Sequence, residues 1–317
     1  MMIATNMRSA VKRYKSLAIL ALLLLAVAIA RPSFFGGDNL RNLFLKVSMQ
    51  GIIGFGMTFC LIAGEFDMSV GSILTLGGIV FAIALERMGF VAALAVTVLT
   101  GVLVGLINGT LIARMRLSSF IGTLGAMYAY KGLALIISKG NPIRVVDPTA
   151  IAISEFRLFG NTIFPFLFIF AGICSAYVLM RTQTGRNFYA VGGNAEVAKY
   201  SGLNVAFYKT LAFVIVGVAS ALAGALTSIR LQSATSIAGN DINLTVVSSV
   251  IIGGTKPSGG SGGAIESFIG LMILAVVEQA LDVLGISGYY QQVVQGFLTV
   301  AIIGASSYSS YRKVSSV

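Results

Sequence analysis

The segment LIAGEFDMSVGS, residues 61–72, places two carboxylates, Glu65 and Asp67, between two long apolar stretches. GIIGFGMTFC precedes the segment and ILTLGGIVFAIAL follows it, and both flanks have the composition of membrane-spanning helices. Gly64 and Gly71 permit irregular backbone, while Asp67 and Ser69 are residue types that cap the exposed amides of a helix. The segment therefore predicts a broken-helix junction between two spans.

The composition of the whole chain agrees with this interpretation. Of 317 residues, 56% are hydrophobic and 10% are charged, whereas a soluble domain carries about 25% charged residues. We predict an all-α polytopic membrane protein with a single transmembrane domain over residues 1–317 and about ten helices, some of them short or broken. The expected spans are 17–34, 43–63, 68–85, 90–113, 119–138, 162–180, 208–229, a short 242–252, 264–284 and 289–308.

Lysines and arginines set the expected orientation. With the N-terminus inside, thirteen of them fall in cytoplasmic segments, eight fall outside and Lys131 lies within a span. The positive-inside rule then places both termini in the cytoplasm. Residues 1–16 form a basic cytoplasmic N-terminus, 139–161 a periplasmic loop and 181–207 a cytoplasmic loop. We interpret the net charge of +11 as the loop lysines and arginines that set the orientation, and not as a sign of nucleic-acid binding.

Catalytic and metal-binding patterns are missing from the sequence. The chain has no histidine, and its two cysteines lie in apolar segments. The sequence has no G-x-x-x-x-G-K-[ST] phosphate loop, and the glycine-rich stretch GGTKPSGGSGG (253–263) reads as a flexible inner loop. We expect neither a catalytic site, a metal site nor a cofactor in this chain.

Several polar or small residues within the spans allow two interpretations each. Asp67 is either a structural cap or a solute contact. Glu278 and Asp282, one turn apart, line either a water-filled outer vestibule or the headgroup interface. Three glycines at intervals of four provide a close-packing face, used either within the chain or between subunits; they are Gly101, Gly105 and Gly109.

The cytoplasmic loop 181–207 contains the sequence GGNAEVAKYSG. Asn194 can cap a short helix, and Gly202 can end it. The sequence therefore predicts about two turns of helix between two spans, the alternative being a simple surface loop.

Five ordered motifs resemble one known family. They are AGEFDMSVGS (63–72), SSFIGTLGAMYAYKGLAL (118–135), GRNFYAVGGNAEVAKYSGLNV (185–205), SVIIGGT (249–255) and LGISGYYQ (284–291). The chain resembles the permease subunits of bacterial ABC importers for simple sugars, in the ribose-type branch. The resemblance runs from the first span to the last.

The resemblance implies a multi-pass protein of the bacterial inner membrane with several partners. These are a cytoplasmic ATP-binding-cassette ATPase that holds ATP and Mg²⁺, a periplasmic solute-binding protein, and a second permease copy in a homodimer or a heterodimer. The implied ATPase-coupling residues are Gly185, Arg186, Gly192, Gly193, Asn194, Glu196 and Lys199. The translocation-path candidates are Asp67, Ser69, Asn108, Thr123, Asn243, Thr245, Glu278 and Gln279.

The sequence departs from the family pattern at two places. Glu65 stands where the family usually has glycine, and residues 243–245 read Asn-Leu-Thr instead of Glu-Leu-Asp. The expected solute is a monosaccharide, with a nucleoside or a furanosyl signalling molecule as alternatives. An ion-coupled secondary transporter that uses Glu278 is a further alternative. Groups suited to a sugar are Tyr128, Tyr130, Tyr289, Tyr290, Gln291 and Gln292.

Overall fold

The computed structural model describes residues 2–314. Helices dominate this part of the chain, and the strands are only two residues long. The α-helices are α1 (Met2–Ala30), α2 (Gly37–Ile62), α3 (Val70–Met88), α4 (Phe90–Gly109), α5 (Ser119–Ser138), α6 (Pro148–Glu155), α7 (Phe164–Arg181), α8 (Gln183–Gly193), α9 (Ala195–Tyr200), α10 (Val205–Leu231), α11 (Ile242–Gly253), α12 (Ala264–Val283) and α13 (Gly288–Val314).

Shorter elements connect these helices. A 3₁₀ turn precedes α2, and a π-helical turn extends α4. The strands form two antiparallel pairs, β1 with β4 and β2 with β3. These elements are η1 (Pro32–Phe35), η2 (Thr110–Arg114), β1 (Ile143–Arg144), β2 (Arg157–Leu158), β3 (Asn161–Thr162) and β4 (Ser233–Ala234).

The fold class is that of an all-α polytopic membrane protein. Within the described residues, seven helices are long and apolar enough to cross a membrane: α2, α3, α4 with η2, α5, α7, α10 and α12. Two shorter apolar helices are Lys15–Ala30, within α1, and α11. A short helix is present where the eighth span is predicted at 242–252, as α11 with twelve residues. The count of ten spans remains a prediction.

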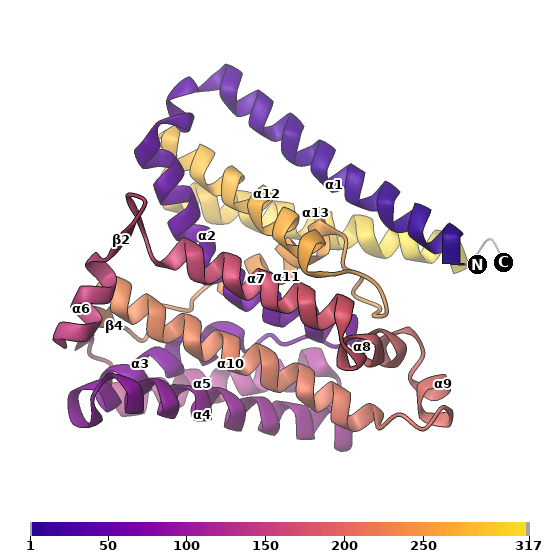
Figure 1. Cartoon of the computed structure of the whole chain (residues 1–317), viewed down its shortest axis with the longest axis horizontal. Coiled ribbons are helices and arrows are strands. Elements are labelled where there is room, and N and C mark those ends of the chain that lie inside the picture. Colours follow the sequence, from indigo (N-terminus) through magenta and orange to yellow (C-terminus); the bar gives the residue numbers. More distant parts are fainter. Residues whose placement is uncertain (1, 315–317) are drawn as a thin grey trace.

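The long helices lie side by side as a bundle (Figure 1). The start of α1 and the end of α13 lie at the same end of the bundle as α8 and α9, whereas α6 and β2 lie at the opposite end (Figure 1). The structure therefore places Met2 and Val314 on the side of the predicted cytoplasmic loop. Which side faces the cytoplasm remains a prediction from the positive charges.

Helices α2 and α10 form the centre of the bundle. The C-terminal half of α2 is apolar on all sides and buried from Gly51 to Ile62, as expected for a helix surrounded by other helices. Helix α10 packs against α2, α3 and α4. The three glycines of α4 face α10: a Cβ on Gly105 would lie 2.5 Å from the Cα of Val214. This close packing lies within the chain, and the alternative of a subunit interface at these glycines is wrong.

The loop 181–207 is more ordered than the sequence indicates. The expected short helix is present as α9, with Asn194 as its N-cap and Gly202 at positive φ beyond its end. A second helix, α8, precedes it and was not predicted from the sequence. The side chain of Thr182 caps α8 by accepting a hydrogen bond from the amide of Gly185, so threonine as an N-cap residue was the signal that could have predicted this helix.

Candidate translocation and coupling sites

Asp67 is the centre of a buried polar network at the junction between α2 and α3. Its Oδ1 accepts hydrogen bonds from the Ser69 amide at 2.8 Å and the Ser69 hydroxyl at 2.5 Å. Its Oδ2 accepts one from Asn108 Nδ2 at 3.2 Å. Asp67, Ser69 and Asn108 are each 0% exposed. The carboxylate therefore has partners on both oxygens and no contact with solvent.

Two residues of α5 complete this network, which we call the junction network (Asp67, Ser69, Asn108, Thr123 and Tyr130). The Tyr130 hydroxyl donates to Asn108 Oδ1 at 2.8 Å. Thr123 Oγ1 accepts from the amide of Met68 at 2.9 Å and donates to a carbonyl of its own helix. Four of the predicted translocation-path candidates thus meet here, together with Tyr130, and their arrangement favours the structural interpretation of Asp67.

The capping at the junction differs from the prediction in two details. Ser69 holds the N-cap position of α3, but its side chain caps no amide and donates to Asp67 instead. Gly64 has the expected positive φ of 80°, whereas Gly71 lies in regular helix. Gly71 is needed for close packing, because a Cβ there would lie 2.2 Å from the carbonyl oxygen of Gly239.

Glu65 points away from Asp67 and makes an ion pair with Lys209 of α10, at 2.5 Å. The Glu65 side chain is 9% exposed and that of Lys209 is 24% exposed. Both acids of the junction are buried, with Glu65 at 7% and Asp67 at 0% exposure. Lys209 compensates the charge of Glu65, which explains how this chain accommodates an acid at the position where the family usually has glycine.

A cavity of about 440 Å³ lies beside the junction network, between α3, α5 and α11. We call it the polar cavity. Lys131 contributes an ammonium that donates to Asn240 Oδ1 at 3.1 Å. Asn243 lies at the wall, accepting from the Gly71 amide at 2.6 Å and donating to Met127 Sδ at 3.1 Å. The lining residues are Met68, Ser72, Leu124, Met127, Tyr128, Lys131, Gly239, Asn240, Asp241, Asn243 and Leu244.

Asn243 is the predicted translocation-path candidate that lines the polar cavity. Thr245, predicted with it, is buried and donates to the carbonyl of Asp241 at 3.1 Å. The sequence reasoning missed Asn240 and Asp241, which lie just before α11, and it recorded Lys131 without a role. A lysine inside a span costs roughly 2.5–3.5 kcal/mol, so Lys131 was itself the signal of a polar cavity.

The remaining candidates, Glu278 and Gln279, lie in the last two turns of α12. Glu278 is 8% exposed and accepts from Gln295 Nε2 of α13 at 2.9 Å. Gln279 is buried at 4% exposure and lines a separate cavity of about 240 Å³. Asp282 pairs with Lys46 and accepts from Gln291 Nε2. Lys46 therefore offsets the repulsion expected between Glu278 and Asp282, a partner that one-turn spacing alone did not reveal.

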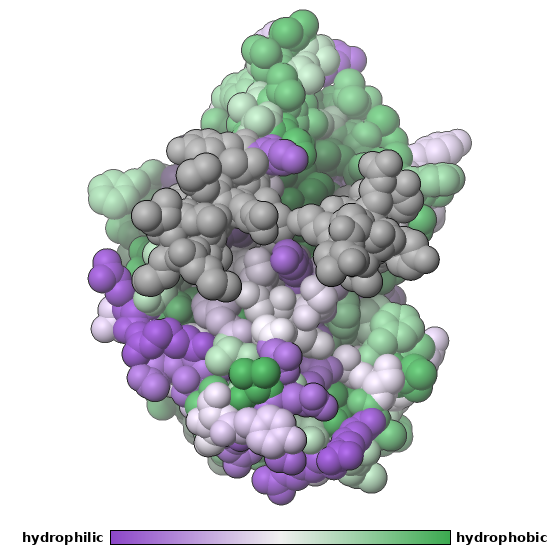
Figure 2. All heavy atoms as spheres, turned by 90° about the vertical axis from the view of Figure 1, so that its right-hand side faces the viewer, coloured by the Kyte–Doolittle hydropathy of each residue, from purple (hydrophilic) through white to green (hydrophobic). Residues whose placement is uncertain are grey.

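The coupling residues lie at the end of the bundle that carries α8 and α9, and Figure 2 shows hydrophilic side chains over much of the lower half of this end. The side chain of Asn194 accepts from the amides of Glu196 and Val197, each at 3.0 Å. Arg186 is exposed and donates to Gln183. Glu196 and Lys199 are exposed and line a groove of about 700 Å³ that also contains Glu65 and Lys209.

Glycines allow the backbone of α8 to pack closely against the end of α2. A Cβ on Gly192 would lie 1.7 Å from the carbonyl oxygen of Ile62, and a Cβ on Gly259 would lie 2.5 Å from the Gly192 carbonyl oxygen. The same Ile62 oxygen accepts a hydrogen bond from the amide of Gly260 at 2.9 Å. At Gly259 and Gly260, the glycine-rich loop 253–263 is therefore packed between α8 and α2. Helix α8 thus contacts the end of α2, next to the junction, directly.

Tyr189 of α8 adds a further contact to the same loop. Its hydroxyl donates to the carbonyl of Gly262 at 2.8 Å. Burial, and secondarily the negative charge of Glu266, raise the pKa of Tyr189 to about 12. The hydroxyl therefore keeps its proton at neutral pH and remains a donor to the loop.

Comparison with known proteins assigns the class. Residues 39–303 match the family described as the branched-chain amino acid transport system / permease component. The ribose import permease protein of Bacillus subtilis is 35% identical over 291 residues, covering 90% of this chain and 89% of that protein. The L-arabinose transport system permease protein of Escherichia coli is 34% identical over 309 residues, covering 95% of this chain and 92% of that protein.

A further relative is the D-allose transport system permease protein of Escherichia coli, 33% identical over 295 residues, covering 92% of this chain and 90% of that protein. No solved structure matches the chain. The fold and these similarities define a membrane transport permease component. The chain belongs to the family of permease subunits of bacterial ABC importers for simple sugars, as its five motifs predicted.

Proposed function

We propose that the chain is the membrane-spanning subunit of an ATP-driven importer that moves a monosaccharide, or a related small polyol, into the cytoplasm. The observation that carries this proposal is the polar cavity, which places hydrogen-bonding groups among the spans. Its volume of about 440 Å³ is in the range of small-molecule sites. The relatives named above carry ribose, L-arabinose and D-allose in their names, and these are all small neutral sugars.

The chemistry of the polar cavity suits a sugar. Each hydroxyl of a sugar donates and accepts hydrogen bonds, and the amides of Asn240 and Asn243 do the same. Lys131 supplies donors, while the exposed ring of Tyr128 offers a face for the C–H side of a sugar ring. Lys131 and Asp241 contribute one charge of each sign, so the pair adds no net charge to the lining, which favours a neutral solute.

The transport cycle that we propose is alternating access driven from the cytoplasmic side. A partner ATPase, with its own ATP and Mg²⁺, docks on α8 and α9, and a periplasmic binding protein delivers the solute at the opposite end. A second permease copy completes the path in the inner membrane, with both termini in the cytoplasm. The packing of Gly192 on Ile62 supports a mechanical route from α8 to the junction, because two backbones in direct contact move together.

ATPase activity in proteoliposomes tests the proposal. The chain is co-expressed with its ATPase and binding protein, and the stimulation of ATP hydrolysis is measured with pentoses, hexoses, polyols and nucleosides. We expect stimulation by one or a few monosaccharides at low concentration. If only a nucleoside stimulates ATP hydrolysis, the proposed solute is wrong, whereas the assignment as an ATP-driven importer stands.

Uptake that follows a proton or sodium gradient, without a co-purified ATPase, would contradict the proposal. In that case Glu278 becomes the coupling candidate, because it is a buried carboxylate in a span. A Glu278→Gln variant then distinguishes the two classes, since it abolishes ion-coupled uptake and leaves ATP-driven uptake in place.

A further inference from the structure

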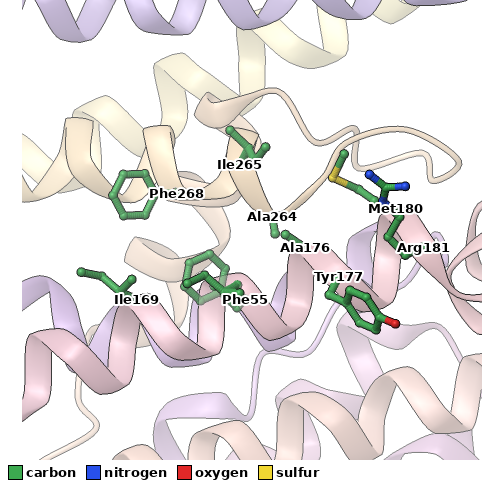
Figure 3. A pocket seen from close by; sticks show the side chains of 11 residues that line it. Phe55, Ile169, Ala176, Tyr177, Met180, Arg181, Ala264, Ile265 and Phe268 are labelled. Carbon is green, nitrogen blue, oxygen red and sulfur yellow. The ribbon is translucent and has the colours of Figure 1, made fainter.

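An apolar groove of about 530 Å³ lies between α7 and the inner end of α12, with α2 as its floor. Figure 3 shows Ile169, Phe55 and Phe268 toward one end of the groove, and Met180 with Arg181 at the other. Among the described residues, α7 packs only on α2, α12, α8 and β3 to a substantial extent. No helix of this part of the chain covers the groove.

The floor of the groove is rigid. Three aromatic rings stack in sequence from three different helices, Phe55 on Phe168 with ring centroids 5.3 Å apart, and Phe168 on Phe268 at 5.5 Å. Gly172 lets α7 approach α2, because a Cβ there would lie 2.7 Å from the ring of Phe55. The hollow is thus built into the packing of α2, α7 and α12 and does not depend on a mobile loop.

The dimensions of the groove match one leaflet of a bilayer. From Ile169 to Arg181 the helix rises about 18 Å at 1.5 Å per residue. Half of a hydrocarbon core about 30 Å thick is about 15 Å. An acyl chain that lies along α7 from its middle to its end therefore stays in apolar surroundings over its whole length.

Charge complementarity decides what kind of molecule fits. Arg181 stands at the end of the groove, is exposed, and forms no ion pair with any carboxylate in residues 2–314. Tyr177 is exposed one turn before Arg181 on α7, and tyrosines are enriched where membrane spans meet the lipid headgroups. A guanidinium is well suited to a phosphate, which it binds through two parallel hydrogen bonds.

We propose that this groove binds a phospholipid of the inner leaflet, with one acyl chain along α7 and its phosphate on Arg181. The leaflet assignment rests on the orientation in the proposed function, whereas the site itself does not. Because the lipid contacts α7 and α12 together, it would hold α7, and α8 after it, against the bundle. The site is separate from the polar cavity and shares no lining residue with it.

Native mass spectrometry of the full-length chain tests the site, with phosphatidylglycerol and phosphatidylcholine as probes. The groove-filling variant is Ala176→Phe, and its matched control is Cys174→Phe, at an exposed position of α7 that does not line the groove. We expect Ala176→Phe to lose the bound lipid that the wild type and Cys174→Phe retain. Equal retention in all three proteins would overturn the proposal.

Arg181→Gln tests the headgroup contact, with Arg114→Gln as a control at the inner end of another helix. One arginine near an anionic surface changes affinity by about fivefold. We expect Arg181→Gln to reduce the preference for phosphatidylglycerol by about that factor and Arg114→Gln to leave it unchanged. If both variants lose the preference for phosphatidylglycerol equally, the preference comes from general surface charge, and this result would contradict the site.

A photoactivatable acyl chain identifies the occupant directly. We expect cross-links to peptides that contain Ile173 or Phe268. A different result is a cross-link between two copies of the protein through α7, together with a changed oligomeric state in Ala176→Phe. In that case a second copy of the protein occupies the groove and the lipid proposal fails. Lipid retention is measured without transport, so failure of the lipid site and failure of the importer proposal are distinguishable.

Discussion

The junction network and the polar cavity are neighbours, yet their polar groups are used differently. Helix α5 contributes to both, with Tyr130 facing the network and Tyr128 and Lys131 facing the cavity. In the network, the Asp67 carboxylate finds all its partners within the protein. In the cavity, the ammonium of Lys131 has one partner among residues 2–314, and two of its three donors are unused there. Internally satisfied groups hold a fold together, whereas groups with spare hydrogen-bonding capacity can bind a solute.

Asp67 provides the largest expected effect. Asp67→Ala removes the acceptor for the Ser69 amide, the Ser69 hydroxyl and the Asn108 amide. Since each unsatisfied buried group costs about 1–3 kcal/mol, we expect the free energy of unfolding to fall by about 3 kcal/mol or more. Thermal unfolding in detergent measures this loss.

Asp67→Asn is the matched variant, because its side-chain oxygen still accepts from Ser69. We expect a loss of about 1 kcal/mol and uptake close to wild type per folded molecule. A stable Asp67→Asn protein that no longer transports would place Asp67 in the translocation path and erase the contrast between the two regions.

Lys131 gives the opposite pattern. Lys131→Met removes donors from the polar cavity and also removes a charge from a span. We expect uptake to fall about tenfold, equivalent to about 1.4 kcal/mol, without a loss of thermal stability, because a lysine in a span is itself costly. Lys139→Met, at an exposed position directly after α5, serves as the control and keeps normal uptake. Normal uptake in Lys131→Met would remove the cavity from the transport path.

Tyr128 and Tyr130 lie within one turn of α5, so substituting each of them compares the polar cavity with the junction network. Tyr130→Phe loses the hydrogen bond to Asn108, so we expect about 1–2 kcal/mol less stability with uptake per folded molecule unchanged. Tyr128 is 68% exposed at the cavity, so Tyr128→Phe should leave stability within about 0.5 kcal/mol, and uptake should stay close to wild type because phenylalanine keeps the ring face. Equal stability losses in both variants would show that the two faces of α5 are not distinct.

Tyr189→Phe measures how much one hydrogen bond outside both regions contributes to the free energy of unfolding. Tyr189→Phe loses the bond to Gly262, and we expect about 1 kcal/mol less stability at neutral pH. The pKa of Tyr189 is raised from 10.0 to about 12, so its contribution is fully present below pH 10 and is lost as pH rises toward 12. Unfolding followed from pH 8 to 12 should show the difference between wild type and Tyr189→Phe disappearing. A constant difference would contradict the burial of this hydroxyl.

The sequence predicted the seven long apolar helices and the position of the junction because apolar runs and their interruptions are local features. It did not predict the partners of Glu65 and Asp67, since Lys209 and Asn108 lie far away in the chain. Tyr130 carried the same local signal as Tyr128, and only tertiary packing separates a network member from a cavity wall. Helix α8 was missed because residues 181–207 were assigned to a cytoplasmic loop with one short helix, and the contact of Gly192 with Ile62 depends on tertiary packing.

The reaction rate of introduced cysteines with a polar thiol reagent tests the central claim most directly. Asn240→Cys at the polar cavity and Thr123→Cys in the junction network are compared in a chain without Cys60 and Cys174, assembled with its partners. We predict that Asn240→Cys reacts and that the transported sugar slows the reaction, while Thr123→Cys does not react. Reaction of Thr123→Cys that the sugar slows, with Asn240→Cys insensitive to sugar, would show that the solute passes through the junction network instead.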